Sequence, residues 1–346
     1  MAIKEIISQS KTVAITGGTG FVAGFVIAEF LNHGYKVKTS LRSLSKFDTL
    51  KEDLKNEVKE EQLANLSAFE ADLTSEKGWR EGFAGCDGVV HVASPLGTGK
   101  ENLAFLRKAA EGGTLIVLNA AKDVGIKRIV ITSSIVCATP MPKNTQQDID
   151  ESLWTDLKNP SIDAYVKSKI YAEKAAWEAA KENNLELTTL LPALILGKSL
   201  GAKNLGTNNI LLQFMNGKTK KSANSPMEIS NIGDLAVLHR LAFENKKAVG
   251  ERFLAASEVL MLPEIAMMMK QRFPNCKVPA KVLKNRTVKF LGLFIPKVKA
   301  VALRLDRAHG HTTQKAQTLL GWQQKSAKQT IEEMMENFEK FNLIEF

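Results

Sequence analysis

The chain has 346 residues, 44% of them apolar, and a formal net charge of +10, which suits one large α/β domain or a cofactor domain with a smaller lobe. Its basic residues occur along the whole chain without a nucleic-acid motif, its first residues include Lys4 and Glu5 in place of an apolar signal, and no apolar stretch reaches the roughly 20 residues that span a bilayer. We therefore expect a cytoplasmic protein that binds neither nucleic acid nor membrane, and three scattered cysteines argue against a disulfide framework or a zinc site.

Strand-like apolar runs alternate with helical patterns over the first half of the chain. We expect strands at 12–15, 35–41, 66–71, 88–93, 128–133 and 187–191, and helices at 21–32, 46–63, 102–123 and 164–183. Strands and helices in this rhythm form βαβ units, which build a parallel sheet covered by helices on both faces. The prediction is an α/β fold with a Rossmann-type, doubly wound parallel sheet.

The rhythm changes after Pro192, where glycine and asparagine interrupt the pattern and the residues after 257 become mostly helical. We predict a dinucleotide-binding Rossmann domain of residues 1–192 plus about 229–256. The remainder, about 193–228 plus 257–346, is predicted to form a smaller, mostly helical substrate-binding lobe.

A glycine-rich turn joins the first strand to the first helix, with the sequence Thr16-Gly17-Gly18-Thr19-Gly20-Phe21-Val22-Ala23. Gly17 permits a tight turn, Gly20 lets the backbone approach a pyrophosphate, and Ala23 allows close packing of the helix on the sheet. The free N–H groups of the helix start then face the anion. The predicted dinucleotide contacts are Gly17, Thr19, Gly20, Phe21 and Val22.

The end of the second strand predicts which dinucleotide is bound. NAD-binding proteins commonly place an acid there for the ribose hydroxyls, but this chain has Arg42 and no acid before Asp48. A guanidinium can bind a 2′-phosphate through two parallel hydrogen bonds, and Lys46 could add a second charge. We therefore predict NADP, or NADPH in its reduced form, with Arg42 and Lys46 at the phosphate.

Three residues form a candidate catalytic group. Ser134 ends the fifth strand, at the edge of the sheet where ligands bind, and Tyr165 and Lys169 share one face of a helix because they are four residues apart. Carbonyl reduction needs a proton donor at the developing alkoxide, which Tyr165 can supply while the ammonium of Lys169 favours the phenolate. Ser134 would hydrogen-bond the carbonyl oxygen. Tyr165 and Lys169 are also expected to contact the cofactor.

These motifs resemble the extended short-chain dehydrogenase/reductase superfamily, also described as the NAD(P)-dependent epimerase/dehydratase superfamily. Within it the chain resembles the dihydroflavonol reductase and cinnamoyl-CoA reductase group and its microbial aldehyde and ketone reductases, through stretches that include 71–74, 90–95, 171–177 and 319–322. The resemblance implies a short-chain reductase acting on CH-OH groups. It also implies further cofactor contacts at Asp72, Leu73, Val92, Ala93, Ser94, Pro192, Leu194 and Thr207.

The chain departs from the group's plant members near the catalytic residues. Before Tyr165 it reads Ser161-Ile162-Asp163-Ala164, where plant cinnamoyl-CoA reductases carry an Asn-Trp-Tyr-Cys stretch. It also has Thr139 where flavonoid reductases typically have asparagine. These differences weaken the case for a plant-type substrate.

The leading hypothesis is NADPH-dependent reduction of a small-molecule carbonyl by a monomer or homodimer. One alternative is a sugar-nucleotide epimerase or dehydratase with tightly bound NAD, and another is a non-catalytic NADP-binding regulator. His309-Gly310-His311 could be half of a metal site, but we expect a surface turn there and no metal, because no cysteine or third ligand is near in sequence.

Overall fold

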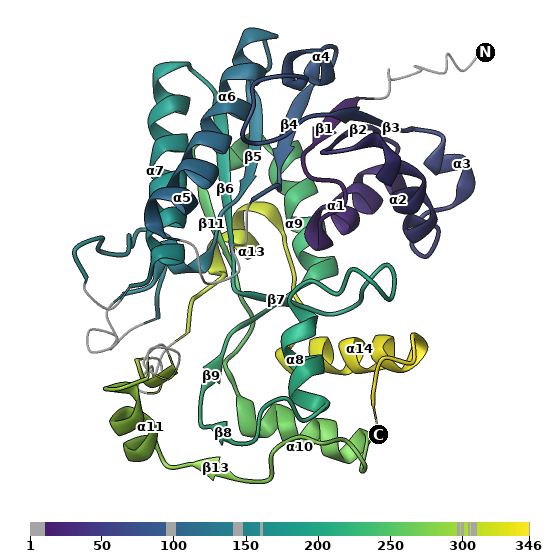
Figure 1. The fold of residues 1–346 in the computed structure, drawn as a ribbon. Helices are drawn as coiled ribbons and strands as arrows, with labels where there is room; N and C mark the ends of the chain where they lie inside the picture. The colour runs from purple at the N-terminus through teal and green to yellow at the C-terminus, as the bar shows by residue number, and fades with distance from the viewer. Residues whose placement is uncertain are drawn as a thin grey trace.

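The computed structural model describes residues 11–94, 102–140, 148–159, 162–295, 298, 301–303, 305 and 310–345. Its centre is a seven-stranded parallel sheet (Figure 1). The strands follow one another across the sheet as β3 (Leu66–Glu70), β2 (Lys36–Leu41), β1 (Thr12–Ile15), β4 (Gly88–His91), β5 (Arg128–Thr132), β6 (Glu186–Pro192) and β11 (Arg252–Ala255). The order reverses between β1 and β4, which opens a crevice at the carboxyl ends of these strands. The predicted doubly wound fold is confirmed.

Helices cover both faces of this sheet because its central strands are apolar on both sides. In β1, Val13 and Ile15 face a core shared with α1 and α9, whereas Ala14 faces a second core shared with α4, α6 and α7. The helices of the first face are α1 (Phe21–Asn32), α2 (Phe47–Leu54), α3 (Glu60–Leu63) and α9 (Ile232–Glu244). Those of the second are α4 (Trp79–Phe83), α5 (Leu103–Arg107), α6 (Gly113–Asp123) and α7 (Ala164–Glu182).

Two predicted helices are interrupted. The helix expected at 46–63 is a short 3₁₀ turn, η1 (Leu44–Lys46), followed by α2 and α3, and the turn between them lets Val58 reach the core. The helix expected at 102–123 contains a π-helical turn, η2 (Lys108–Gly112), between α5 and α6. This turn brings Gly113 against Leu73, so closely that a Cβ at Gly113 would lie 2.9 Å from that of Leu73.

The chain after Pro192 contributes short strand pairs and helices below the sheet in Figure 1. The pairs are β7 (Leu194–Leu196) with β10 (Ile229–Asn231), β9 (Pro226–Met227) with β12 (Leu260–Met261), and β8 (Ser222–Ala223) with β13 (Val282–Leu283). The helices of this lower region are α8 (Asn208–Met215), α10 (Leu262–Arg272), α11 (Asn285–Gly292) and α14 (Ala327–Lys340). The 3₁₀ turn η5 (Lys246–Ala248) and α13 (Gln314–Leu320) pack beside α9 and β11, and η3 (Ile135–Ala138) comes earlier in the chain, directly after β5.

Most of this region has a hydrophobic core of its own, built from α8, α10 and α14. Two segments join the first half of the chain. From α9 to β11 the chain returns to the main sheet, whereas Ile229–Asn231 pairs outside it. Helix α13 and Trp322 also pack in the core around α1 and α9. No helix within the described ranges is long and apolar enough to cross a membrane.

Candidate functional site

A cleft of about 1210 Å³ lies at the carboxyl ends of the central strands. This volume exceeds the roughly 300–1,000 Å³ typical of pockets for one small molecule, so it can accept a dinucleotide together with a second ligand. Every residue predicted to bind cofactor or to act in catalysis lines the cleft except Lys46.

The glycine-rich turn forms a cradle with no room for side chains. Gly17 has φ +77°, and a Cβ on it would lie 2.9 Å from the Cβ of Ala93. Its N–H donates to Ser40 Oγ at 2.9 Å, which fixes the turn against the end of β2. Helix α1 begins after Gly20 with no side-chain cap from the described residues, so its first N–H groups are available to an anion. These residues fit a pyrophosphate.

Thr16 and His91 order the end of β4 beneath the cleft. Thr16 Oγ1 accepts hydrogen bonds from the N–H groups of Val92 and Ala93, both at 3.0 Å, and lies 2.8 Å from His91 Nδ1. Burial lowers the pKa of His91 to about 3, which keeps the ring neutral. Because Thr16 Oγ1 already accepts two hydrogen bonds, its own O–H is left to donate to Nδ1. This pair fixes the backbone that precedes Ser94.

The predicted phosphate-binding cations differ in position. Arg42 lines the cleft at the end of β2, whereas Lys46 is exposed in the η1 turn and does not. Asp72, which also lines the cleft, accepts from the Thr74 hydroxyl at 2.5 Å and from its N–H at 2.8 Å. These hydrogen bonds, helped by the charge of Arg42, lower the pKa of the Asp72 carboxyl. Arg42 therefore lies close enough to the Asp72 carboxylate to stabilise its charge at this end of the cleft.

The three candidate catalytic residues all line the cleft. Ser134 begins η3, and its Oγ faces the N–H of Val136 at 3.5 Å. Tyr165 lies in the first turn of α7, which is capped by Asp163 at 2.9 Å from the N–H of Val166. Lys169 is buried one turn later, and its Nζ donates to Ser94 Oγ at 2.9 Å. The helix therefore presents a phenol and an ammonium to the cavity that contains the serine.

A buried carboxylate behind the catalytic residues was not predicted from the sequence. Glu173 follows Lys169 by one helical turn and accepts hydrogen bonds from Ser133 Oγ at 2.5 Å and Thr189 Oγ1 at 2.9 Å. Arg252 Nε lies 2.8 Å from the same carboxylate. Its spacing of four from Lys169 was a visible signal, because Tyr165, Lys169 and Glu173 share one helix face.

Arg252 connects this carboxylate to the loop that follows β5. Its guanidinium stacks on Trp154 at 3.8 Å and donates to the carbonyl oxygens of Glu151 and Leu153. Within this loop Thr155 Oγ1 donates to Val136 O at 2.7 Å, so the loop is tied back to η3. The network therefore holds the helix of Tyr165, the strand of Ser134 and one wall of the cleft in a fixed relation.

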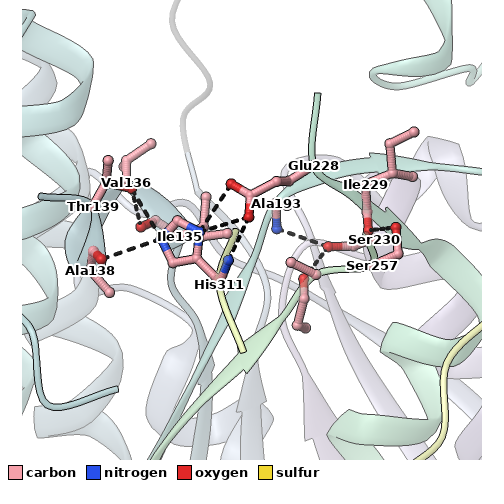
Figure 2. A network of polar contacts seen from close by, with 12 residues as sticks. Ile135, Val136, Ala138, Thr139, Ala193, Glu228, Ile229, Ser230, Ser257 and His311 are labelled. Atoms are coloured by element: carbon pink, nitrogen blue, oxygen red, sulfur yellow. Dashed lines mark hydrogen bonds and ion pairs between the residues drawn. The ribbon is translucent and has the colours of Figure 1, made fainter. Parts of the chain in front are cut away.

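Glu228, which lines the cleft, pairs with the buried side chain of His311 (Figure 2). His311 Nδ1 lies 2.9 Å from Glu228 Oε1, and the His311 N–H donates to the same oxygen at 2.7 Å. On the other side of the ring, Nε2 faces Ala138 O at 3.3 Å and Thr139 Oγ1 at 3.4 Å. The surface turn predicted here is wrong for His311, because the side chain is buried by contacts that are distant in sequence. His309 lies outside the described residues.

The segment after β6 also reaches the cleft. The cleft is lined, as predicted, by Pro192, Leu194 and Thr207. The Thr207 hydroxyl donates to Ile195 O within its own segment. Asn204, which the sequence did not single out, donates to Thr19 O at 2.9 Å and so ties this segment to the glycine-rich turn. Ser230 Oγ accepts from the Ala193 N–H at 2.8 Å and fixes the backbone beside Pro192 (Figure 2). The described residues contain no group of three or more potential metal ligands.

Comparison with known proteins places this site in context. The family model described as "NAD dependent epimerase/dehydratase family" matches residues 13–254. Anthocyanidin reductase of Vitis vinifera is 32% identical over 287 residues, covering 78% of this chain and 83% of that protein. Cinnamoyl-CoA reductase 1 of Arabidopsis thaliana is 33% identical over 278 residues, covering 78% and 77%. The structure of yeast methylglyoxal/isovaleraldehyde reductase with NADPH superposes with a TM-score of 0.77 at 23% identity, covering 96% of this chain and 99% of that one.

Proposed function

The chain belongs to the NAD dependent epimerase/dehydratase family, and on that premise we propose that it is an NADPH-dependent carbonyl reductase that converts an aldehyde or ketone to an alcohol. The resemblance predicted from the sequence is confirmed, since the similar proteins include anthocyanidin, cinnamoyl-CoA and dihydroflavonol reductases. The observation that carries the proposal is the convergence of Ser134, Tyr165 and Lys169 on the cleft that also contains the glycine-rich turn.

The residues of the cleft fit NADP. The turn at Gly17 and the open start of α1 would hold the pyrophosphate, and Arg42 would bind the 2′-phosphate beside Asp72. Val92, Ala93 and Ser94 would line the nicotinamide half with Pro192 and Leu194. The bound cofactor supplies a hydride to the substrate carbonyl carbon. The name of the yeast reductase, which was solved with NADPH, supports the same choice.

The chain's own residues supply the proton chemistry. The hydroxyls of Ser134 and Tyr165 would both donate to the carbonyl oxygen, which polarises the bond and holds it in place. Tyr165 would then give its proton to the developing alkoxide, and in oxidation it would take that proton back. The ammonium of Lys169, held by Ser94 at 2.9 Å, stabilises the phenolate that remains.

The lining beyond the catalytic residues indicates the substrate. Ile135, Ile162, Met227 and Val259 supply apolar surface at this end of the cleft, and the carboxylates of Asp163 and Glu228 also line it. We propose a small to medium, partly apolar carbonyl compound as substrate. We also propose that the region with its own core, around α8, α10 and α14, is the substrate lobe.

Cofactor oxidation by the purified protein tests the proposal. NADPH and NADH would each be offered with a panel of aldehydes, α-keto esters and diketones. Tyr165→Phe is compared with Tyr171→Phe, a matched control on the same helix that stacks under Arg107 at 3.9 Å. We expect turnover that prefers NADPH, is abolished by Tyr165→Phe and survives Tyr171→Phe.

Other outcomes would favour the two alternatives. Purified protein that carries tight NAD and converts nucleotide sugars would indicate an epimerase or dehydratase. Tight NADP binding without turnover of any carbonyl or nucleotide sugar would indicate a regulator. Carbonyl reduction that persists in Tyr165→Phe would contradict the assigned role of this tyrosine.

A further inference from the structure

The net charge of the protein is concentrated in one segment. Residues 265–305 contain ten Lys and Arg and no Asp or Glu, while the other 37 basic residues are balanced by 37 acidic ones. The whole excess of +10 therefore belongs to about one eighth of the chain. Basic residues are spread evenly along the sequence, so they do not reveal this asymmetry. The local excess of positive charge arises because this segment lacks Asp and Glu.

The same segment exposes large apolar side chains. Leu293 is 76% exposed, Phe294 72% and Phe290 62%, and Val282 and Ile295 are also exposed. The rings of Phe290 and Phe294 stack edge to face at 5.4 Å, so they form one raised apolar surface. Of the other large exposed apolar residues in the described chain, Phe105 and Ile210 line the cleft, Leu44 lies in η1 and Met267 on α10.

Helix α11 explains why these side chains point outward. Val288 and Gly292 are buried and attach the helix to the protein, which leaves Arg286, Lys289, Phe290 and Leu293 on its exposed side. Lys281 and Lys284, just before the helix, are also exposed. We define the basic apolar patch as these residues with Val282, Phe294 and Ile295.

We infer that the basic apolar patch binds an anionic membrane surface, which replaces the expectation from the sequence that the protein binds no membrane. Cations that surround exposed Phe, Leu and Ile side chains match a surface with negative headgroups above an apolar interior. A second copy of the chain is disfavoured as the occupant, because a two-fold contact would bring the two positive patches together. Phe290 and Phe294 could also stack on bases, but the other three apolar members, Leu293, Ile295 and Val282, are aliphatic and match a membrane interior better than a base.

The patch lies beside the substrate end of the protein. Strand β13 pairs with β8, and β9, which follows closely, contributes Pro226 and Met227 to the cleft. Helix α11 lies at the lower edge of Figure 1, at the opposite end of the molecule from α4 and α6. Docking through this patch would bring the apolar end of the cleft near the bilayer, where lipophilic carbonyl compounds accumulate.

Vesicle sedimentation tests the inference directly, with a readout independent of reductase activity. The purified protein is mixed with vesicles of phosphatidylcholine alone, or of phosphatidylcholine and phosphatidylserine in a two-to-one ratio. We expect binding only to the second kind, weakened by added salt. Lys284→Gln with Arg286→Gln should weaken it about 25-fold, because each cation contributes about fivefold at an anionic surface.

Two further variants distinguish a membrane from other anionic partners. Leu293→Ser with Phe294→Ser should weaken vesicle binding by at least about tenfold, because both side chains lose the gain from burial. Lys77→Gln with Lys122→Gln, just before α4 and on α6, removes the same charge elsewhere and should leave binding unchanged. These residues are exposed, so all variants should keep their melting temperature.

Three results would overturn the inference. They are no sedimentation with the anionic vesicles, equal weakening by the Lys77 and Lys122 control, and full binding by the Leu293 and Phe294 variant. Immobilised single-stranded DNA would then show what the patch binds instead. If the Leu293 and Phe294 variant keeps full vesicle binding, and only the Lys284 and Arg286 variant loses retention on the DNA, the patch is a phosphate-binding surface and not a membrane surface.

Discussion

Replacing Glu173 with glutamine tests whether charge holds together the buried network behind the candidate catalytic residues. The Glu173 side chain is 1% exposed and that of Arg252 8%, with 2.8 Å between Oε1 and Nε. Glutamine keeps the size of the side chain but leaves the guanidinium buried without a counter-charge. The other partners of Arg252 are neutral carbonyl groups and the face of Trp154. Breaking a buried pair by removing one partner costs about 3–5 kcal/mol.

A surface pair at the same distance provides the control. Arg272 Nη2 and Glu339 Oε2 are 2.7 Å apart, but their side chains are 37% and 60% exposed. Glu339→Gln should cost no more than about 1 kcal/mol, because water screens and replaces the lost interaction. The two variants thus differ in burial and not in contact geometry.

Chemical denaturation of the two variants and the wild type measures these free energies. Thermal unfolding gives a second reading, with an expected fall of roughly 4–7 °C for Glu173→Gln in a chain of this length. Glu173→Met with Arg252→Met should cost less than the sum of the single changes, because it leaves no unpaired buried charge. Equal losses for Glu173→Gln and Glu339→Gln would refute the reasoning from burial.

Three further predictions concern the cofactor turn, the cofactor phosphate and acid stability. Arg42→Ala should raise the KM for NADPH by about 10- to 100-fold through loss of a charge-assisted contact, and an equal rise for NADH would contradict the phosphate role. Gly17→Ala should lower NADPH affinity and the melting temperature more than Gly34→Ala, since both have φ near +80° but a Cβ would meet no atom within 4 Å at Gly34. Burial lowers the pKa of His91 to about 3 and of His239 to about 4, so protons bind mainly after unfolding and stability falls as the pH drops below about 6.5. Denaturant midpoints at neutral pH and near pH 5 should therefore differ less in His239→Gln than in the wild type.

The sheet could be predicted from sequence because its signal is local. Continuous apolar runs such as Val89–Val90 and Ile129–Ile131 indicate strands that are buried on both faces, and all six predicted strands are present. The helices were less certain, since periodicity does not report where a neighbouring element forces a break. The contact between Gly113 and Leu73, beside the π-helical turn η2 that separates α5 from α6, is one such case.

The candidate site divides in the same way. Sequence predicted that five residues line the cleft, namely Gly17, Arg42, Ser134, Tyr165 and Lys169. A residue at the carboxyl end of a parallel strand lies at the edge of the sheet where ligands bind, and two residues four apart lie on the same face of a helix. Lys46 was not, since a one-turn 3₁₀ element directs it away from the cleft.

Sequence alone determined the fold class, the glycine-rich turn and the candidate catalytic group, since each depends on residues that are close in the chain or on the common edge of a parallel sheet. Tertiary structure alone decided that Glu173 meets Arg252 and that Glu228 meets His311, which are 79 and 83 residues apart. It also decided that α11 stays uncovered. Burial of a charge and exposure of an apolar face depend on what packs against them, and no local pattern records that.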